Sequence, residues 1–274
     1  MRILAINDIS CMGKCSLTTA LPIISACGVE CNVLPTALLS THTGGFTGYT
    51  FRDLTEDIDG ILHHWKSLNV KFDYIVSGYL GSISQIDLVA FIKDNFLAEN
   101  GKFIVDPVMG DGGELYAGFT AEYVEKMRGL CKSADYILPN VTEAAFLANT
   151  PYPIDKNNVQ ATLDNLLELC PMPIVTGILD EKEISVYFTN RKGVKYSFSH
   201  ENVECFFHGA GDVFAAAFVG CLARGKHVAD SIYLASDFTA AAIRRSAKEV
   251  NDKRFGLNFE MEIFPFLQKL ESVK

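Results

Sequence analysis

The stretch His208-Gly209-Ala210-Gly211-Asp212, followed at once by the alanine-rich apolar run Val213–Phe218, is the most informative part of the sequence. Two glycines around a single alanine allow a tight backbone turn, and the apolar run predicts the first turns of a buried helix. A loop that leads into a helix N-terminus offers unpaired N–H groups and the positive end of the helix dipole. The stretch therefore predicts an anion site, above all one for phosphate.

Asp212 has two interpretations at such a site. A carboxylate would repel a bound phosphate, unless its task is to take the proton of a hydroxyl that attacks that phosphate. Alternatively, Asp212 is only a helix cap, a place where aspartate is favoured, and the glycines merely close a loop. These few residues alone do not distinguish a catalytic base from a cap.

Length and composition bound the class of protein. The chain has 274 residues, 49% of them hydrophobic, and a formal net charge of −9. We expect one domain over residues 1–274 with a sizeable core. The acidic balance argues against a nucleic-acid partner, which needs a basic face, and favours small-molecule partners. The N-terminal apolar run is too short for a signal peptide and no stretch is long enough for a membrane helix, so we expect a cytoplasmic protein with no membrane partner.

The eight cysteines are typical of small buried thiols in a reducing compartment rather than of a disulfide framework. Cys11, Cys15, Cys27 and Cys31 form two C-x3-C pairs. The C-x2-C spacing common in zinc sites is missing, and Cys27 is expected to end a helix. We therefore do not predict a zinc site.

Apolar strands alternate with helical patterns along the chain. We expect strands at residues 2–7, 30–39, 72–77, 103–105, 134–138 and 172–177, helices at 16–26, 50–68, 85–95, 157–169, 213–224, 228–246 and 260–271, a further helix after Asn140, and an antiparallel hairpin over 184–198 that turns near 190–193. Repeated strand–helix units favour a three-layer α/β/α sandwich with a mainly parallel central sheet and a late antiparallel hairpin.

The polar residues that follow the first two strands are candidates for a site, because open α/β sheets collect their chemistry where the strands end. Asp8 and Ser10 follow the first strand, and the hydroxyl- and glycine-rich loop Ser40–Gly48, which contains His42 and Thr43, follows the second. Such a loop is suited to fold over a polar, uncharged ligand. Turn formation, helix capping and a plain surface loop are the alternatives.

Later strands end in polar residues too. Asp106 and Asp111 lie five residues apart after an apolar strand and could hold a metal through water, or be turn residues. Asn140 and Glu143 fit a capping box in its asparagine form. The functional alternative is that Glu143 shares a crevice with Asp106 and helps to place magnesium. Thr176, followed by a glycine, ends another strand.

Four motifs in this order resemble the ribokinase-like superfamily in its vitamin kinase branch, and within that branch the pyridoxal (pyridoxine, pyridoxamine) kinases. The motifs are Asp106–Asp111, Pro139–Glu143, Val175–Gly177 and Gly209–Asp212. On the substrate side, Ser40–Gly44 resembles the Ser-Asn-His-Thr-Gly segment of those enzymes, and Gly78-Tyr79 resembles their Thr-Gly-Tyr segment. The likeness runs from residue 2 to at least residue 245.

The resemblance implies an ATP-dependent kinase that phosphorylates the 5′-hydroxymethyl group of a B6 vitamer, with Mg²⁺ and a monovalent cation, K⁺ or Na⁺, as cofactors. Asp212 would be the general base, and the N–H groups of Gly209, Ala210 and Gly211 would form an anion hole. The residues that would orient magnesium, mainly through water, are Asp106 and Glu143. The resemblance also suggests a homodimer.

The resemblance also divides the remaining candidates between the two substrates. Tyr79, His42 and Thr43 would contact the pyridine ring, and Asp8 and Ser10 would reach its polar substituents. The residues expected at the ATP phosphates are Asn140, Thr176, Gly209 and Gly211.

Two positions depart from the family pattern. Ala210 stands where the family loop often has threonine, which leaves the backbone donors in place. Asp8 stands where many pyridoxal kinases have serine, and is more like the hydroxymethylpyrimidine phosphate kinases. A carboxylate facing the 4′ substituent would favour the cationic aminomethyl group of pyridoxamine over the aldehyde of pyridoxal, because an ionised hydrogen bond is the stronger one.

Several other functions stay open at this point. The nearest is a hydroxymethylpyrimidine (phosphate) kinase of thiamine synthesis, and a more distant one is a sugar or nucleoside kinase. A non-catalytic sensor of nucleotide or vitamin would have no need of a base such as Asp212. A dinucleotide dehydrogenase is disfavoured because no G-x-G-x-x-G follows the first strand.

Overall fold

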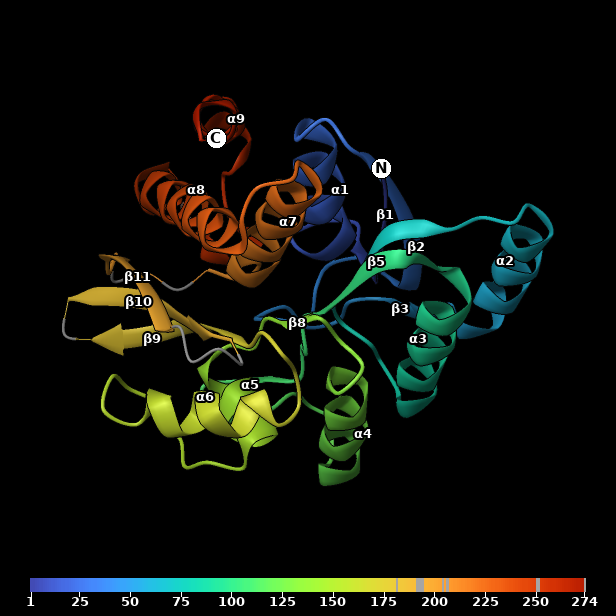
Figure 1. Ribbon diagram of the computed structural model, residues 1–274, viewed down its shortest axis with the longest axis horizontal. Coiled ribbons are helices and arrows are strands. Elements are labelled where there is room, and N and C mark those ends of the chain that lie inside the picture. The colour runs from blue at the N-terminus through green and yellow to red at the C-terminus, as the bar shows by residue number, and fades with distance from the viewer. Residues whose placement is uncertain (181, 191–194, 204, 206, 250–251, 274) are drawn as a thin grey trace. The chain divides into compact units, whose positions relative to one another are not determined.

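The computed structural model describes residues 1–180, 182–190, 195–203, 205, 207–249 and 252–273. Residue contacts divide the chain into two compact units, which we call unit 1 (Met1–Tyr74 with Val203–Lys274) and unit 2 (Ile75–Asn202). Figure 1 shows the elements of each. The expectation of one domain over residues 1–274 stays a prediction.

Strands and helices alternate through both units. Unit 1 contains β1 (Arg2–Ser10), α1 (Ser16–Ala26), β2 (Glu30–Leu39), β3 (Phe51–Asp53), α2 (Thr55–Ser67), α7 (Ala210–Ala223), α8 (Val228–Glu249), α9 (Ile263–Ser272) and the short 3-10 helices Lys253–Phe255 and Glu260–Glu262. Unit 2 contains α3 (Ile83–Phe96), β5 (Leu97–Val105), β6 (Gly110–Asp111), β7 (Glu114–Leu115), α4 (Ala121–Cys131), β8 (Tyr136–Ile137), α5 (Val141–Ala148), α6 (Val159–Leu167), β9 (Ile174–Asp180), β10 (Glu183–Thr189) and β11 (Lys195–Glu201). The strand β4 (Phe72–Ser77) runs from one unit into the other.

The largest sheet has the strand order β3-β2-β1-β4-β5-β8. The pairs β1–β2 and β5–β8 are parallel, and the short edge strand β3 is antiparallel to β2. A separate antiparallel sheet has the order β11-β10-β9. The predicted α/β fold, with a mainly parallel sheet and a late antiparallel hairpin, is therefore confirmed. The predicted turn near residues 190–193 falls almost entirely outside the described residues.

The first strand is longer than predicted. It continues through Ser10, so Asp8 and Ser10 lie on the strand and not in a loop after it. A register shift between Asn7 and Ile9 lets the strand keep pairing with β2 as far as Leu39. The polar side chains do not end the strand because they bond one another, as described below.

The predicted helix at 50–68 was wrong at its start. Phe51–Asp53 form the edge strand β3, and the helix begins at Thr55. The helical spacing that included Phe51 was accidental, since this side chain is 46% exposed and its backbone pairs with Leu39. The strand predicted from residue 103 likewise begins earlier, at Leu97, and neither the α4 helix nor the β6–β7 hairpin was predicted.

The buried helix α7 is the part of unit 1 that positions the glycine loop. It packs against α1 and α8, and its residues from Val213 to Ala223 are all buried. A Cβ added at Gly220 would lie 2.5 Å from the Sγ of Cys27, so a glycine is needed where the C-terminal end of α1 meets α7. The tight packing fixes the N-terminus of α7 against the start of α1.

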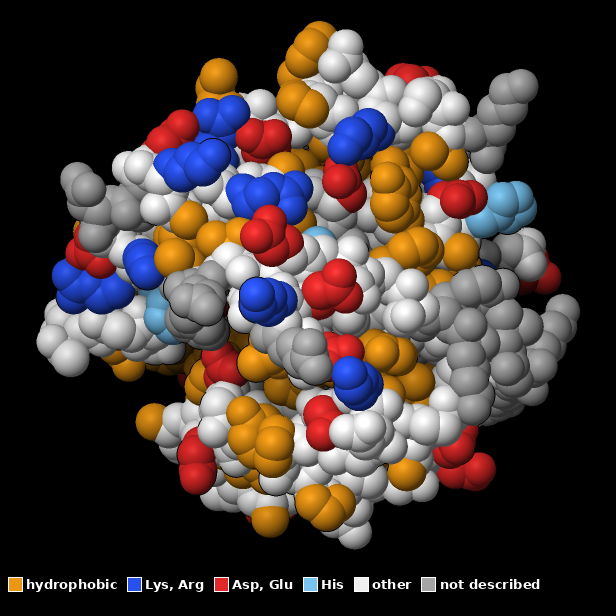
Figure 2. Space-filling model, turned by 90° about the vertical axis from the view of Figure 1, so that its left-hand side faces the viewer, with side chains coloured by type: hydrophobic (Ala, Val, Ile, Leu, Met, Phe, Trp, Pro, Cys, Tyr) orange, Lys and Arg blue, Asp and Glu red, His pale blue; other side chains and the backbone are white. Residues whose placement is uncertain are grey.

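The surface carries charges of both signs. On the face seen in Figure 2, Lys and Arg side chains lie among Asp and Glu side chains. Ion pairs such as Lys269–Asp237 at 2.6 Å and Arg245–Glu249 at 2.9 Å contribute to this mixture. Among the described residues, no helix combines the length and the apolar character needed to cross a membrane.

Candidate active site

The N-terminus of α7 is built on a glycine at a position where any other residue would be strained. Gly209 is the N-cap, with φ at +83°. A Cβ there would collide with the carbonyl oxygen of Lys14. The helix starts at Ala210, so Gly211 and Asp212 lie in its first turn, where N–H groups have no carbonyl partner within the helix. Asp212 is the third helical residue and does not occupy the cap position.

Asp212 sits in a polar but water-poor setting. The Nδ2 of Asn7 donates to its Oδ1 at 3.4 Å, and the backbone N–H of Ser16 donates to the same carboxylate. The pKa of Asp212 is raised to about 6, mainly through loss of solvent and also through the nearby charge of Asp8, although the two hydrogen bonds lower it. A carboxylate of this pKa is ionised at neutral pH and still a better proton acceptor than an ordinary aspartate.

Asp8 is a buried carboxylate beside the half-buried Asp212. Its side chain accepts from the hydroxyl of Ser10 at 2.9 Å and from that of Ser16 at 2.5 Å, and the residue is 5% exposed. Burial raises the pKa of Asp8, and the two hydroxyls oppose that rise. The Oδ1 of Asn7 also accepts from the backbone N–H of Asp8 at 3.0 Å. Asn7 and Ser16 thus each bond both Asp8 and Asp212.

His42 in the loop after β2 has both ring nitrogens engaged. Its Nδ1 accepts from the N–H of Gly44 at 3.1 Å, and its Nε2 lies 2.6 Å from the carbonyl oxygen of Arg254. Because a carbonyl only accepts, Nε2 carries the proton and Nδ1 is the acceptor. The ring is 8% exposed, so contact with a ligand would be through its face or edge. Thr43 beside it is exposed.

Aromatic and cationic side chains hold this loop onto the turn around residue 254. Phe46 lies edge-on to His42 at 5.0 Å and to Phe255 at 5.2 Å, and the guanidinium of Arg254 lies 5.0 Å from the Phe46 ring. Arg254 is itself paired with Asp252 at 2.7 Å. We call His42, Phe46, Arg254 and Phe255 the loop clasp.

In unit 2, the N-terminus of α5 is closed by its own side chains. The Oδ1 of Asn140 accepts from the N–H of Glu143, and the Oε2 of Glu143 accepts from the N–H of Asn140, both at 2.9 Å. The Oε1 of Glu143 accepts from the N–H of Met109 at 3.1 Å, and the Nδ2 of Asn140 donates to the carbonyl of Gly110 at 2.9 Å. The predicted capping box is therefore confirmed. Burial raises the pKa of Glu143, and the charge of Asp111 adds to this rise.

The predicted magnesium ligands fit a hydrated ion better than a directly bound one. Asp106 directly follows β5 and is 8% exposed. Both oxygens of Glu143 already accept backbone N–H groups. Within the described part of the chain, no three or more His, Cys, Asp or Glu side chains gather closely enough to hold a metal. Carboxylates of this kind suit Mg²⁺, which keeps much of its water when bound.

Thr176 and Tyr79 are also fixed within unit 2. The N–H of Thr176 donates to the carbonyl of Pro139 at 3.0 Å, and Thr176 is bridged to Asn140. The ring of Tyr79 stacks on Phe119 at 5.9 Å, and Phe119 stacks on a further tyrosine.

The structure thus brings the candidates together in two groups. One group, in unit 1, contains Asp8, Ser10 and Asp212, and the other, in unit 2, contains Asn140, Glu143 and Thr176. The sequence reasoning missed Asn7, Ser16 and Arg254. Asn7 could have been found, because it begins the polar run that contains Asp8. Ser16 and Arg254 gave no signal, since a serine at a helix start and a surface arginine are ordinary.

Comparisons with known proteins identify kinases that are similar to this chain. The sequence profile of the phosphomethylpyrimidine kinase family matches residues 20–258. A Bacteroides thetaiotaomicron protein, provisionally named a phosphomethylpyrimidine kinase and crystallised with pyridoxal, is 35% identical, with a TM-score of 0.90 over 97% of this chain and 95% of that one. Pyridoxal kinase from Lactobacillus plantarum is 30% identical, with a TM-score of 0.91 over 99% and 98% of the two chains.

Curated relatives match over shorter stretches. Pyridoxal kinase of Dictyostelium discoideum is 27% identical over 58% of this chain and 54% of its own length. The chain spans between 29% and 65% of the length of the first four such relatives. The resemblance to pyridoxal kinases is confirmed, and an ATP-dependent phosphotransferase with an alcohol acceptor is the class to which these kinases belong. The chain belongs to the phosphomethylpyrimidine kinase family.

Proposed function

We propose that the chain is an ATP-dependent vitamin B6 kinase, which phosphorylates the 5′-hydroxymethyl group of pyridoxamine, pyridoxine or pyridoxal. The observation that carries the proposal is the N-terminus of α7, where a glycine N-cap leaves the first N–H groups to a ligand and Asp212, with a raised pKa, lies in the first turn. The Bacteroides relative crystallised with pyridoxal supports the choice of substrate.

In this proposal Asp212 takes the proton of the substrate hydroxyl. The hydroxyl oxygen then bonds to the γ-phosphorus of ATP, the bond from that phosphorus to the bridging oxygen breaks, and ADP leaves with the electron pair. The N–H groups of Gly209, Ala210 and Gly211 would hold the charge that develops on the transferred phosphoryl group. This is the chemistry that a helix N-terminus with a neighbouring base is suited to perform.

Mg²⁺ would neutralise phosphate charge when bound. We propose that Asp106 and Glu143 orient it through water, with Asn140 and Thr176 near the ATP phosphates and a monovalent cation, K⁺ or Na⁺, as a second ion. Since both polar ends of the Asn140 side chain are used within the fold, its contribution would be to keep the Gly110 turn in place.

On the vitamin side, Tyr79, His42 and Thr43 would contact the pyridine ring, and Asp8 and Ser10 its polar substituents. Ionised Asp8 would favour pyridoxamine, because its carboxylate would pair with the cationic aminomethyl group. Comparing kcat/KM for the three vitamers in the native protein and in Asp8→Ser tests this preference. An unchanged ranking would contradict it.

The test of the function is to incubate the protein with Mg-ATP and pyridoxamine, pyridoxine, pyridoxal or hydroxymethylpyrimidine, and to measure ADP release and the phosphorylated product. We expect turnover with at least one B6 vitamer and a lower kcat/KM for hydroxymethylpyrimidine. Preferred turnover of hydroxymethylpyrimidine would instead assign the protein to thiamine synthesis. Binding of both ligands without turnover would indicate a sensor.

We also propose that the protein is a cytoplasmic homodimer with only small-molecule ligands, and with neither nucleic acid nor membrane as a partner. The acidic balance of the chain supports the last part, since its net charge is −9. Light scattering of the purified protein would give the mass in solution, which should be twice the chain mass of 30.1 kDa.

A further inference from the structure

Ser16 has a backbone conformation that its residue type does not explain. Its φ is +52°, in the left-handed region. Of the described non-glycine residues, only Asn69 and Asn149 share this feature, and asparagine is the type that tolerates it best. Both asparagines follow the ends of helices, where the left-handed conformation is common, whereas Ser16 begins α1. A strained residue of this kind persists only where its surroundings determine it.

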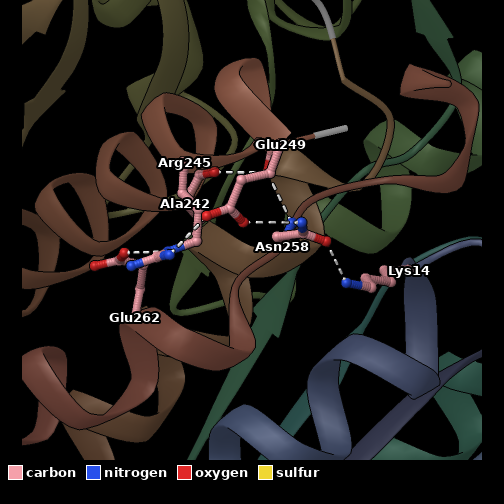
Figure 3. A network of polar contacts seen from close by, with 7 residues as sticks. Lys14, Ala242, Arg245, Glu249, Asn258 and Glu262 are labelled. Atoms are coloured by element: carbon pink, nitrogen blue, oxygen red, sulfur yellow. Dashed lines mark hydrogen bonds and ion pairs between the residues drawn. The ribbon is translucent and has the colours of Figure 1, made fainter. Parts of the chain in front are cut away.

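Lys14, two residues before Ser16, is held in place by contacts of its backbone and its side chain. The N–H of Lys14 donates to the carbonyl of Phe255 at 3.1 Å, and the carbonyl of Lys14 packs on Gly209. The Nζ of Lys14 donates to the Oδ1 of Asn258 at 2.7 Å, which leads into the polar network shown in Figure 3. In that network the Nδ2 of Asn258 donates to the Oε2 of Glu249. The backbone N–H of Asn258 donates to the hydroxyl oxygen of Ser246 at 2.7 Å.

The two hydrogen-bonding groups of Ser16 serve different carboxylates. Its backbone N–H donates to Asp212, and its hydroxyl donates to the Oδ1 of Asp8 at 2.5 Å. A glycine would adopt the same backbone more easily and could supply only the first of these bonds. The hydroxyl explains why the strain is kept, because without it a buried carboxylate would lose a partner.

We propose that Ser16 is a positioning residue that fixes Asp8 and Asp212 relative to each other, and so couples the vitamin-binding carboxylate to the base. The proposal rests on the proposed function for the roles of the two aspartates. It implies that a change at Ser16 alters the proton-transfer step through two carboxylates at once, and that its effect depends on which residue stands at position 8.

The groups that face Asp8 and Asp212 decide how the protonation of these two carboxylates depends on pH. Asp8 faces the hydroxyls of Ser10 and Ser16 and the ring of His42, and Asp212 faces Asn7, Ser16 and Asp8. The remaining titratable neighbour, Cys15, stays a neutral thiol because burial raises its pKa. Removing the Ser16 hydroxyl would therefore favour protonated Asp8. Because the negative charge of Asp8 raises the pKa of Asp212, the pH at which Asp212 takes up a proton would fall.

The test compares Ser16→Ala and Ser16→Gly with the native protein, measuring kcat and KM for pyridoxamine and Mg-ATP from pH 5 to 9. We expect kcat to fall about tenfold, the value for one lost hydrogen bond to a charged group, with KM for ATP little changed. The acidic limb of the kcat profile should move to lower pH. Ser16→Gly is the variant to use where Ser16→Ala does not fold, because glycine accepts the backbone conformation.

Two matched controls separate positioning from stability. Asn69→Gly relieves the same backbone conformation at an exposed position, and Thr18→Ala removes a neighbouring hydroxyl that donates to the carbonyl of Cys15. Both should keep the native kcat and pH profile. In the Asp8→Ser background, Ser16→Gly should cost little further kcat, because the hydroxyl has then lost its carboxylate partner.

The proposal would be overturned if Ser16→Gly lowered kcat by the same factor in the native and Asp8→Ser backgrounds and left the acidic limb of the kcat profile unmoved. Absence of any B6 phosphorylation by the native protein would instead reject the proposed function. In that case a ¹³C NMR titration of the aspartate carboxyl groups is the readout. A lower pKa of Asp212 in Ser16→Ala than in the native protein would support the coupling, and an equal or higher one would overturn it.

Discussion

The N-termini of α5 and α7 carry a carboxylate at the same helical position and use it differently. Glu143 is the third residue after the N-cap Asn140, and Asp212 is the third residue after the N-cap Gly209. In α5 the cap and the carboxylate bond each other's backbone N–H groups. In α7 the cap has no side chain, so no cap side chain bonds the first N–H groups, which we propose bind the phosphoryl group.

Glu143 and Asp212 also differ in the groups that donate hydrogen bonds to them. Glu143 accepts backbone hydrogen bonds from Asn140, Met109 and Gly110, so it is bound into the fold by fixed donors. Asp212 accepts one backbone hydrogen bond, from Ser16, and one side-chain hydrogen bond, from Asn7 at 3.4 Å. Burial raises the pKa of both. Carboxylates at the same helical position therefore have different hydrogen-bond partners, which supports the different roles that we propose for them.

The largest effect on stability is expected from a substitution of the N-cap residue of α7. Gly209→Ala should lower the free energy of unfolding by about 2–4 kcal/mol, because its Cβ would collide with the Lys14 carbonyl and the backbone is left-handed. Gly211→Ala is the matched control, since a Cβ there meets open space. Urea denaturation measures both. Equal stability of the two variants would show that the cap geometry is not enforced.

Removing each carboxylate should move stability in opposite directions. At pH 8, Asp212→Asn should stabilise the fold by about 1–2 kcal/mol, because a carboxylate whose pKa is raised on folding destabilises the folded state at pH values above that pKa. Burial also penalises ionised Glu143, but Glu143→Gln should destabilise the fold by about 1–3 kcal/mol, since the amide NH2 of glutamine would leave the N–H of Met109 or Asn140 without an acceptor. Thermal unfolding measures both changes in stability. A shift of the same sign in both variants would show that the two carboxylates do not differ in their effect on stability.

The pH dependence of stability and of activity gives a further test of the role of Asp212. Asp212 binds a proton in the folded state up to about pH 6 and in the unfolded state only to about its ordinary value of 3.8. Stability contributed by this group is therefore full below that ordinary value and is lost as pH rises through about 6. Activity should run the other way, with kcat/KM falling about tenfold per pH unit below 6. A flat profile from pH 5 to 7 would contradict the assignment.

The smallest effect is expected at the loop clasp. Arg254→Ala should raise KM for the vitamin about 3- to 10-fold through loss of its contact with Phe46, and leave kcat within about twofold. Arg52→Ala removes an arginine that is 72% exposed in its side chain and serves as the control. A fall in kcat without a change in KM would place Arg254 nearer the chemistry.

Local patterns were enough to predict most of the fold. The apolar periodicity located the main strands and helices, and the three-residue spacing of Asn140 and Glu143 predicted a capping box because both bonds lie within one helical turn. The edge strand β3 was missed because it has three residues, and pairing with β2, not its own pattern, makes it a strand.

The candidate site was less accessible from the sequence. Glycines and a following apolar run identified the N-terminus of α7, but the left-handed backbone of Ser16 arises from contacts with distant segments, including the packing of Lys14 on Gly209. The orientation of His42 likewise depends on a carbonyl 212 residues away. Such constraints come from tertiary contacts, which a local pattern does not encode.

The most direct test of the account is the rate of phosphoryl transfer in a single turnover by Asp212→Asn, with saturating Mg-ATP and pyridoxamine at pH 8. Saturation removes effects on binding, so the rate reports the step in which the hydroxyl loses its proton. We expect a loss of about 100- to 10,000-fold relative to the native protein, with ATP still bound, and a much smaller loss in Glu143→Gln. A rate for Asp212→Asn within a few-fold of the native one would contradict it.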